Sequence, residues 1–170
     1  ISVREQLNRS VYDRWMDSGT LYAVSQHSML MLTTPEPPTY LFTYFYTEYL
    51  EMLLLVLTQR VGILSFSMEA GKLAKVARDK NDKIGGDTLS LQERYVVFKN
   101  QFLLPELSSQ EQTIEMYDLL QQNLYIHRQK EMLDDQIQSL YEINQTKSNN
   151  IRERENAKFN LILFFFTVWT

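Results

Sequence analysis

Few side chains in the sequence have the types and spacing that catalysis or metal binding requires. The two histidines, His27 and His127, do not belong to a recognisable metal-ligand motif. Glu111, Glu115 and Asp118 lie at positions i, i+4 and i+7, which places three carboxylates on one face of a helix. Acidic residues in a first helical turn also complement the helix dipole, which is the simpler interpretation. We therefore predict that the protein is not an enzyme.

The composition predicts a helical protein. The chain has 170 residues, four prolines, five glycines and no cysteine, so it holds one ordinary domain with little material for turns. Disulfides and thiolate metal sites are excluded. The net charge is -4 and the pI is about 5.2, and no basic stripe is present, so we expect no nucleic-acid partner.

An apolar run, residues 159–170, follows a charged segment, residues 151–158. A membrane-spanning helix needs about 20 apolar residues, and runs of about 10 to 14 are also found in buried or interfacial segments. Because the chain begins at Ile1 and its sequence ends within this pattern, we expect an excerpt of a longer protein. We interpret residues 159–170 as the start of a transmembrane helix. The residues expected at membrane entry are Lys158, Phe159, Leu161, Ile162, Leu163, Phe164, Phe165, Phe166 and Trp169.

Positive charges precede the apolar run. Lys147, Arg152, Arg154 and Lys158 lie on its amino-terminal side, and short flanks rich in Lys and Arg tend to stay in the cytoplasm. We therefore predict a cell-membrane protein with residues 1–158 on the cytoplasmic side.

The amino-terminal part, residues 1–34, is predicted to be a helical segment. Apolar residues recur at four-residue steps between Val3 and Asp17. Residues 20–34 fit either a helix or a buried strand near Met29, and we favour the helix. The prolines of residues 34–38 form a linker that no helix crosses.

A helix of about 40 residues is predicted from Thr39 to Arg78, about 60 Å long. Its centre is apolar enough to suggest a second membrane span, but polar residues recur along it every seven positions: Glu51, Thr58, Ser65 and Lys72. Carboxylates at the centre of a bilayer are costly, so we expect a bundle helix instead. The residues expected in its core are Leu53, Leu54, Leu57, Val61 and Leu64.

Two further helices complete the predicted bundle, which covers residues 39–143. Ser90 and Glu93 form a capping box that starts a helix ending near Leu104. A stalk helix with the same capping signal begins at Ser109 and runs without a breaker to the end. Its heptad positions hold Met116, Leu119, Ile126, Leu133, Ile137, Leu140 and Ile151.

Residues 144–158 form a polar neck on the stalk helix. Because the connections between helices are short, the fold class is all-α, an antiparallel helical bundle with a very long carboxy-terminal stalk that leads into the first transmembrane helix.

These elements resemble the cytoplasmic part of CorA-type divalent-cation channels, and more closely a bacterial subgroup of CorA-like proteins with two transmembrane helices. The residues that carry the resemblance are Arg14-Trp15, Gly19-Thr20-Leu21-Tyr22, residues 59–67, residues 109–118 and the approach to the membrane at residues 156–170. The family's Gly-Met-Asn signature would lie beyond Thr170. The family's α/β amino-terminal domain is missing or replaced by helices.

The resemblance implies a homo-oligomer, usually a pentamer, whose stalks surround an axis and respond to cation concentration. Regulatory ions in that family lie between carboxylates of neighbouring subunits. By resemblance, Glu111, Glu115 and Asp118 are the candidate ligands for Mg²⁺, which keeps most of its water and needs one or two acidic ligands. No other cofactor is expected.

Three functions remain open. The first is the cytoplasmic module of a CorA-like channel or transporter for a divalent metal ion of the magnesium type. The second is a membrane-anchored helical scaffold or signalling protein that oligomerises through its stalk. The third is a soluble coiled-coil interaction protein whose apolar end is buried against a partner.

Overall fold

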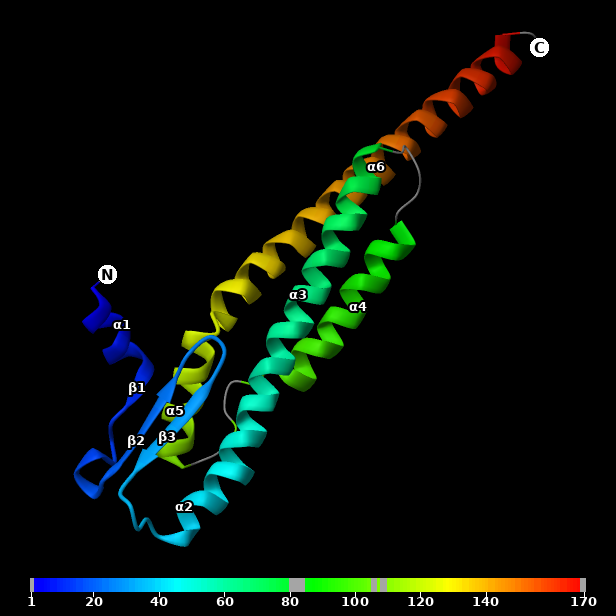
Figure 1. Cartoon of the computed structure of the whole chain (residues 1–170). Coiled ribbons are helices and arrows are strands. Elements are labelled where there is room, and N and C mark those ends of the chain that lie inside the picture. The colour runs from blue at the N-terminus through cyan, green and yellow to red at the C-terminus, as the bar shows by residue number, and fades with distance from the viewer. Residues whose placement is uncertain (1, 80–84, 105–106, 108–109, 169–170) are drawn as a thin grey trace. The chain divides into compact units, whose positions relative to one another are not determined.

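The computed structural model describes residues 2–79, 85–104, 107 and 110–168. Helices dominate these residues, as the composition predicts, and a small three-stranded sheet accompanies them. The elements are α1 (Val3–Ser10), β1 (Val11–Tyr12), the 3₁₀ turn η1 (Met16–Ser18), β2 (Thr20–Val24), β3 (Met29–Thr33), α2 (Thr39–Tyr44), the π-helical η2 (Phe45–Tyr49), α3 (Leu50–Asp79), α4 (Gly85–Phe102), α5 (Glu111–Asn123) and α6 (Ile126–Val168) (Figure 1).

The chain divides into two compact units. The first comprises Ile1–Ser65 and Val97–Met132, and the second comprises Phe66–Val96 and Leu133–Thr170. Helices α3, α4 and α6 therefore contribute residues to both units.

The helix expected over residues 20–34 is wrong, because this segment is an antiparallel hairpin. Leu21 pairs with Leu32 and Ala23 pairs with Leu30. Burial in β2 alternates, with every second side chain enclosed, and this two-residue period selects a strand over a helix. At the turn, the Ser25 hydroxyl accepts a hydrogen bond from the Ser28 amide at 3.0 Å. The helix predicted from Val3 to Asp17 is present but ends at Ser10.

The long helix predicted over residues 39–78 is confirmed as α2, η2 and α3 in sequence, but the predicted core face is wrong. Of the five residues expected in the core, Leu53 is partly exposed. The other four, Leu54, Leu57, Val61 and Leu64, are between 37% and 65% exposed. The buried positions of η2 and α3 are Tyr49, Met52, Val56, Gln59, Ile63, Ala70 and Ala77. Because Leu57 is exposed, Leu57→Ala should not carry the cost of about 2 to 5 kcal/mol that truncation of a buried leucine carries.

A buried polar network explains which face of α3 points inward. Gln59 is fully buried, and its Nε2 donates to the Phe102 carbonyl and to the Tyr117 hydroxyl, both at 2.7 Å. The Tyr117 hydroxyl donates to the Leu104 carbonyl at 2.9 Å, and Gln121 Nε2 donates to Gln59 Oε1 at 3.3 Å. Because a buried amide without partners costs about 1 to 3 kcal/mol, this network fixes the rotation of α3.

Helix α4 begins earlier than its predicted capping box. It starts at Gly85, so Ser90 lies inside the helix and does not cap it. Thr88 and Leu91 are buried, and packing of this first turn extends the helix beyond the local capping signal. The predicted antiparallel pairing with α3 is confirmed by two contacts within the second unit, Arg94 with Glu69 and Tyr95 with Phe66.

The predicted unbroken stalk is also wrong, because α5 and α6 are separated by a turn at Leu124 and Tyr125. Tyr125 has a φ of 57°, a conformation that side-chain-bearing residues adopt rarely. Leu124 and Ile126 on either side of it are both buried, so the turn encloses two apolar side chains that a straight helix would point in different directions. The capping residue Ser109 lies outside the described residues.

In the second unit, α6 runs in the same direction as α3 and opposite to α4. Ser67 Oγ donates to Gln136 Oε1 at 2.7 Å, and further along both helices the Lys147 ammonium group binds the carbonyl of Ala77. The Tyr95 hydroxyl of α4 donates to Asp134 at 2.9 Å. Among the predicted heptad residues, Leu133, Ile137 and Leu140 form the buried seam of this unit.

We predict that Gly62→Ala destabilises the protein by about 1 to 3 kcal/mol, the usual cost of overpacking. An added Cβ at this position would lie 2.3 Å from the Phe98 ring, and Phe98 is itself buried. Gly71→Ala in the same helix is the matched control, because its Cβ meets nothing within 4 Å. It should stabilise the protein by about 1 kcal/mol through helix propensity. Chemical denaturation measures both, and equal stabilities would contradict the contact.

Candidate functional site

The two carboxylates Glu111 and Glu115 bind one guanidinium group in the first unit. Arg14, which follows β1, places Nη2 2.8 Å from Glu111 Oε2 and Nη1 2.9 Å from Glu115 Oε1. The Tyr12 hydroxyl donates to the second oxygen of Glu115 at 2.6 Å. The sheet and α5 are thus joined by a charged cluster of four side chains, which we call the Arg14 cluster.

The hydrogen bonds of the Arg14 cluster shift the acid–base properties of its members. The Tyr12 hydroxyl, followed by the Arg14 guanidinium, lowers the pKa of Glu115 below its ordinary value. Burial, followed by the hydrogen bond to Glu115, raises the pKa of Tyr12 above its usual range. Both effects favour the protonation states present at neutral pH, a neutral phenol and an ionised carboxylate.

The three candidate metal ligands are not arranged as one site. Glu111 and Glu115 face Arg14, whereas Asp118 is exposed further along α5. Among the described residues, no group of three or more His, Cys, Asp or Glu side chains is placed to hold a metal ion. A cation on the glutamates would have to compete with Arg14. Arg14 and Tyr12 could not be recognised from the sequence as partners of Glu115, because about a hundred residues separate them from it.

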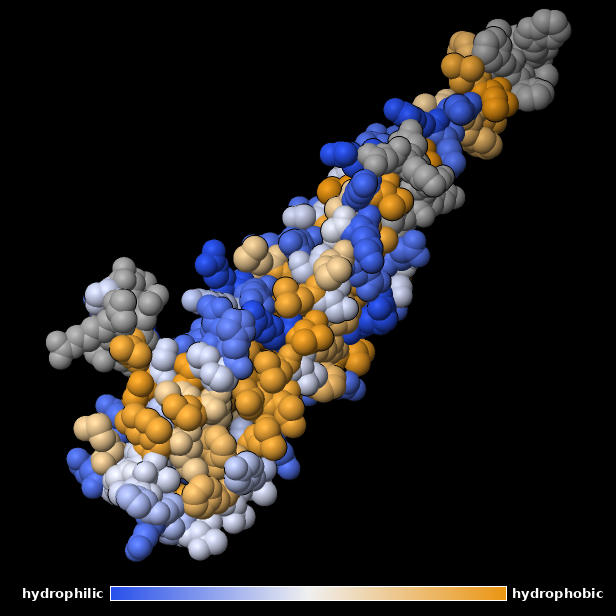
Figure 2. All heavy atoms as spheres, in the orientation of Figure 1, coloured by the Kyte–Doolittle hydropathy of each residue, from blue (hydrophilic) through white to orange (hydrophobic). Residues whose placement is uncertain are grey.

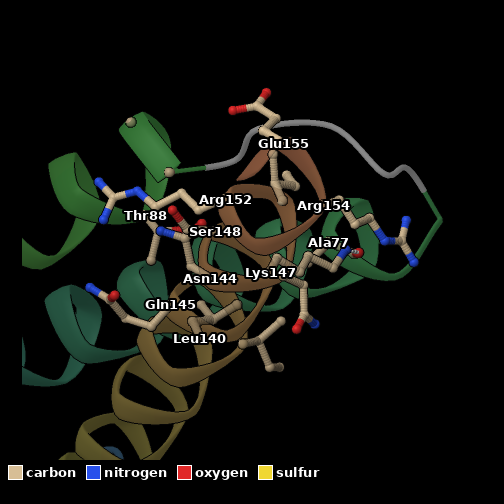
Figure 3. Close-up of a pocket in the computed structure, with 15 residues that line it drawn as sticks. Ala77, Thr88, Leu140, Asn144, Gln145, Lys147, Ser148, Arg152, Arg154 and Glu155 are labelled. Atoms are coloured by element: carbon tan, nitrogen blue, oxygen red, sulfur yellow. Dashed lines mark hydrogen bonds between the residues drawn. The ribbon is translucent and has the colours of Figure 1, made fainter. Parts of the chain in front are cut away.

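A cavity of about 650 Å³ lies in the second unit, lined by residues of α3, α4 and α6 (Figure 3). Asn144, Ser148 and Thr88 contribute amide and hydroxyl groups to its wall. Arg152 and Arg154 point to opposite sides of α6 in Figure 3. The charges of these two arginines therefore do not converge on one point.

The predicted membrane-entry residues lie at the carboxy-terminal end of α6. Lys158 is exposed, and so are five apolar residues after it: Phe159, Leu161, Ile162, Leu163 and Phe164. Phe165 and Phe166 belong to the helix, and their side chains lie outside the description, as does Trp169 as a whole. The helix itself continues to Val168.

Within the described residues, one helix is long and apolar enough to cross a membrane. It is Thr39–Arg78, 40 residues long, and its most apolar window has a mean hydropathy of 1.5 with 22% of that window buried. A helix in the core of a protein can have the same length and apolar composition.

The first unit exposes apolar side chains on both its long helix and its sheet. On α3, five residues form a row that we call the α3 stripe: Leu50, Leu54, Leu57, Val61 and Leu64. On β3, Leu30 and Leu32 are about half exposed and lie on one face of the sheet. Figure 2 shows apolar side chains gathered over the sheet and the adjoining part of α3. The first unit thus has exposed apolar side chains on α3 and on one face of β3.

Comparison of the chain with protein-family models, curated proteins and solved structures gives no match.

We predict that the Arg14 cluster makes stability depend on pH in the acid range. A lowered folded-state pKa stabilises the fold above the unfolded-state value, near 4.5 for Glu115, and this contribution is lost as the pH falls through the folded-state pKa. Glu115→Gln should therefore destabilise the protein at pH 7, and its difference from wild type should shrink as the pH falls below about 4.5.

Tyr117→Phe is the control, because it removes a buried tyrosine hydroxyl from the same unit that donates to a carbonyl. Its cost should vary little over the same pH range. Denaturant unfolding at several pH values measures both variants. A Glu115→Gln difference that stays constant from pH 7 to pH 3 would contradict the cluster.

Proposed function

We propose that the chain is the cytoplasmic, helical module of a CorA-like membrane protein that conducts divalent metal ions of the magnesium type. The observation that carries this proposal is the course of α6. Its 43 residues would span about 65 Å, and they lead from the buried seam through the polar neck of residues 144–158 into an exposed apolar end. Phe159, Leu161 and Ile162 are each more than half exposed there, so lipid is the natural environment for this segment.

The proposal treats α3 as a bundle helix, although its composition would suit a membrane span. The inward face of α3 carries a polar side chain with a partner inside the protein: Gln59 donates a hydrogen bond to the Phe102 carbonyl. Glu69 of the same helix forms an ion pair with Arg94. Lipid around this helix would surround charged residues on both α3 and α4, at a cost of several kcal/mol each.

The cytoplasmic location rests on the basic residues of the neck. Arg152, Arg154 and Lys158 are exposed immediately before the apolar end. Short basic flanks of this kind are retained on the cytoplasmic side during membrane insertion.

Divalent ions enter the proposal through the resemblance to CorA-type channels and through the acidic residues of α5. The side chain of Glu111 is 75% exposed and reaches solvent beside Arg14. Mg²⁺ bound through its water shell needs only one or two such groups. In an assembly of several copies, carboxylates of neighbouring chains would complete the site.

The alternative is a membrane-anchored scaffold that oligomerises without conducting ions. The exposed α3 stripe favours this reading, because an apolar interaction surface serves assembly whether or not a pore exists. A coiled-coil protein that buries its apolar end against a protein partner is the third possibility.

Magnesium flux into liposomes distinguishes these possibilities. Full-length protein reconstituted into vesicles that contain a magnesium-sensitive dye should admit Mg²⁺ faster than protein-free vesicles. Protein that floats with the vesicles yet admits no Mg²⁺ would support the scaffold. Protein that does not float with vesicles would contradict membrane attachment.

The orientation is tested separately by thiol labelling at introduced cysteines, because residues 1–170 contain no cysteine of their own, with the unsubstituted full-length protein as the background. Arg154→Cys in the full-length protein should react with a membrane-impermeant maleimide only after the cells are permeabilised. A cysteine placed at Asn150, which is also exposed on α6, should behave in the same way. Labelling of either residue in intact cells would contradict the cytoplasmic location.

A further inference from the structure

The α3 stripe has the spacing of a helix-pairing seam. Leu50, Leu54, Leu57, Val61 and Leu64 follow one another at steps of four, three, four and three residues. This is the spacing at which apolar residues recur when one helix packs along another. All five residues lie in the first unit and on one helix.

The described part of one chain leaves this seam uncovered. The buried row of α3, which includes Val56, Gln59 and Ile63, has the same four–three spacing. In heptad terms it lies about 150° around the helix from the stripe, almost opposite to it. Helix α3 therefore carries two seams, of which the described residues fill one. The sequence pattern indicates that the stripe should be buried, and the described residues do not bury it.

We propose that the α3 stripe is the docking surface for a second copy of this chain, whose α3 packs against it in parallel and in register. Leu50, Leu57 and Leu64 then occupy heptad position d, and Leu54 and Val61 occupy position a. Leucine at d with leucine or the β-branched valine at a suits a pair of parallel helices.

The residues beside the stripe are compatible with this pairing. In the parallel register, Leu53 of one copy faces Thr58 of the other, and Arg60 faces Ser65. No like charges are opposed in these pairs. Arg60 also contacts the Gln26 carbonyl at the tip of the hairpin at 3.3 Å, which holds its guanidinium beside the stripe.

A lipid surface fits the stripe less well than a second helix does. The stripe is narrow, and Glu51, Thr58 and Ser65 run along one side of it. A bilayer deep enough to cover the leucines would also take in the Glu51 carboxylate. A second helix covers the narrow row and leaves this polar edge in water.

The parallel direction follows from entry of both copies into one membrane, and this step rests on the proposed function. A parallel pair in register is related by a two-fold axis along the paired helices, so equivalent segments of the two copies run the same way along that axis. An antiparallel pair would send equivalent segments in opposite directions along the helices.

Single introduced cysteines test the pairing, because residues 1–170 contain none of their own, with the unsubstituted full-length protein as the background. In full-length protein in membranes, Leu57→Cys and Leu54→Cys should each form disulfide-linked dimers on mild oxidation, at least tenfold more than Val97→Cys. Val97 is the matched control, since it is an apolar residue of the same unit that is similarly exposed on α4. In light scattering in mild detergent, Leu57→Lys should lower the assembled mass and Val97→Lys should not.

The outcomes separate this inference from the proposed function. Dimers that form only when Leu50→Cys is mixed with Val61→Cys would indicate antiparallel pairing and overturn the parallel register. A cysteine at residue 57 that does not crosslink, but whose attached fluorophore shifts to the blue on vesicles, would overturn the inference in favour of lipid. In either case, flotation and magnesium flux would still decide the membrane function independently.

Discussion

The rotation of α3 about its own axis is the constraint on which the rest of the first unit depends. Gln59 sets it, because its amide is fully buried and bonds at once to the end of α4 and to Tyr117 of α5. Turning the helix by one residue would leave the Phe102 carbonyl and the glutamine amide without these partners in the interior. Leucines can be exchanged between faces of a helix at modest cost, whereas a buried amide cannot lose its partners cheaply.

This constraint decides which apolar residues are left outside. With Gln59 inward, Gly62 also faces inward and lets the Phe98 ring approach the backbone, so α4 sits close to α3 along this turn. The leucines and valine of the α3 stripe then face away from these contacts. The exposed stripe is thus a consequence of the polar network inside the unit, and its regular spacing explains why a second helix is the partner that suits it.

The sequence predicted the long elements and failed where tertiary contacts override a local pattern. The helix over residues 39–78 was predicted correctly, because its length and the prolines that precede it are visible in the local sequence. The buried face of that helix was predicted wrongly. Residues 50–57 are apolar on most sides of the helix, and the polar residues that recur every seven positions do not single out one buried face. The hairpin of β2 and β3 was missed because the short apolar run from Met29 to Leu32 fits a helix or a strand equally well. The turn at Tyr125 carries no glycine or proline, so nothing in the local sequence marks it.

The candidate site shows the same limit in its electrostatics. The spacing of Glu111 and Glu115 predicted a shared helix face, which α5 provides, but it could not reveal that Arg14 lies opposite. With that guanidinium in place the glutamates hold the sheet to α5, as a structural ion pair would. The same carboxylates remain at the surface, where the energy of an exposed pair is small and screened by salt. The contacts of Arg14 with these two glutamates should therefore weaken as the ionic strength rises.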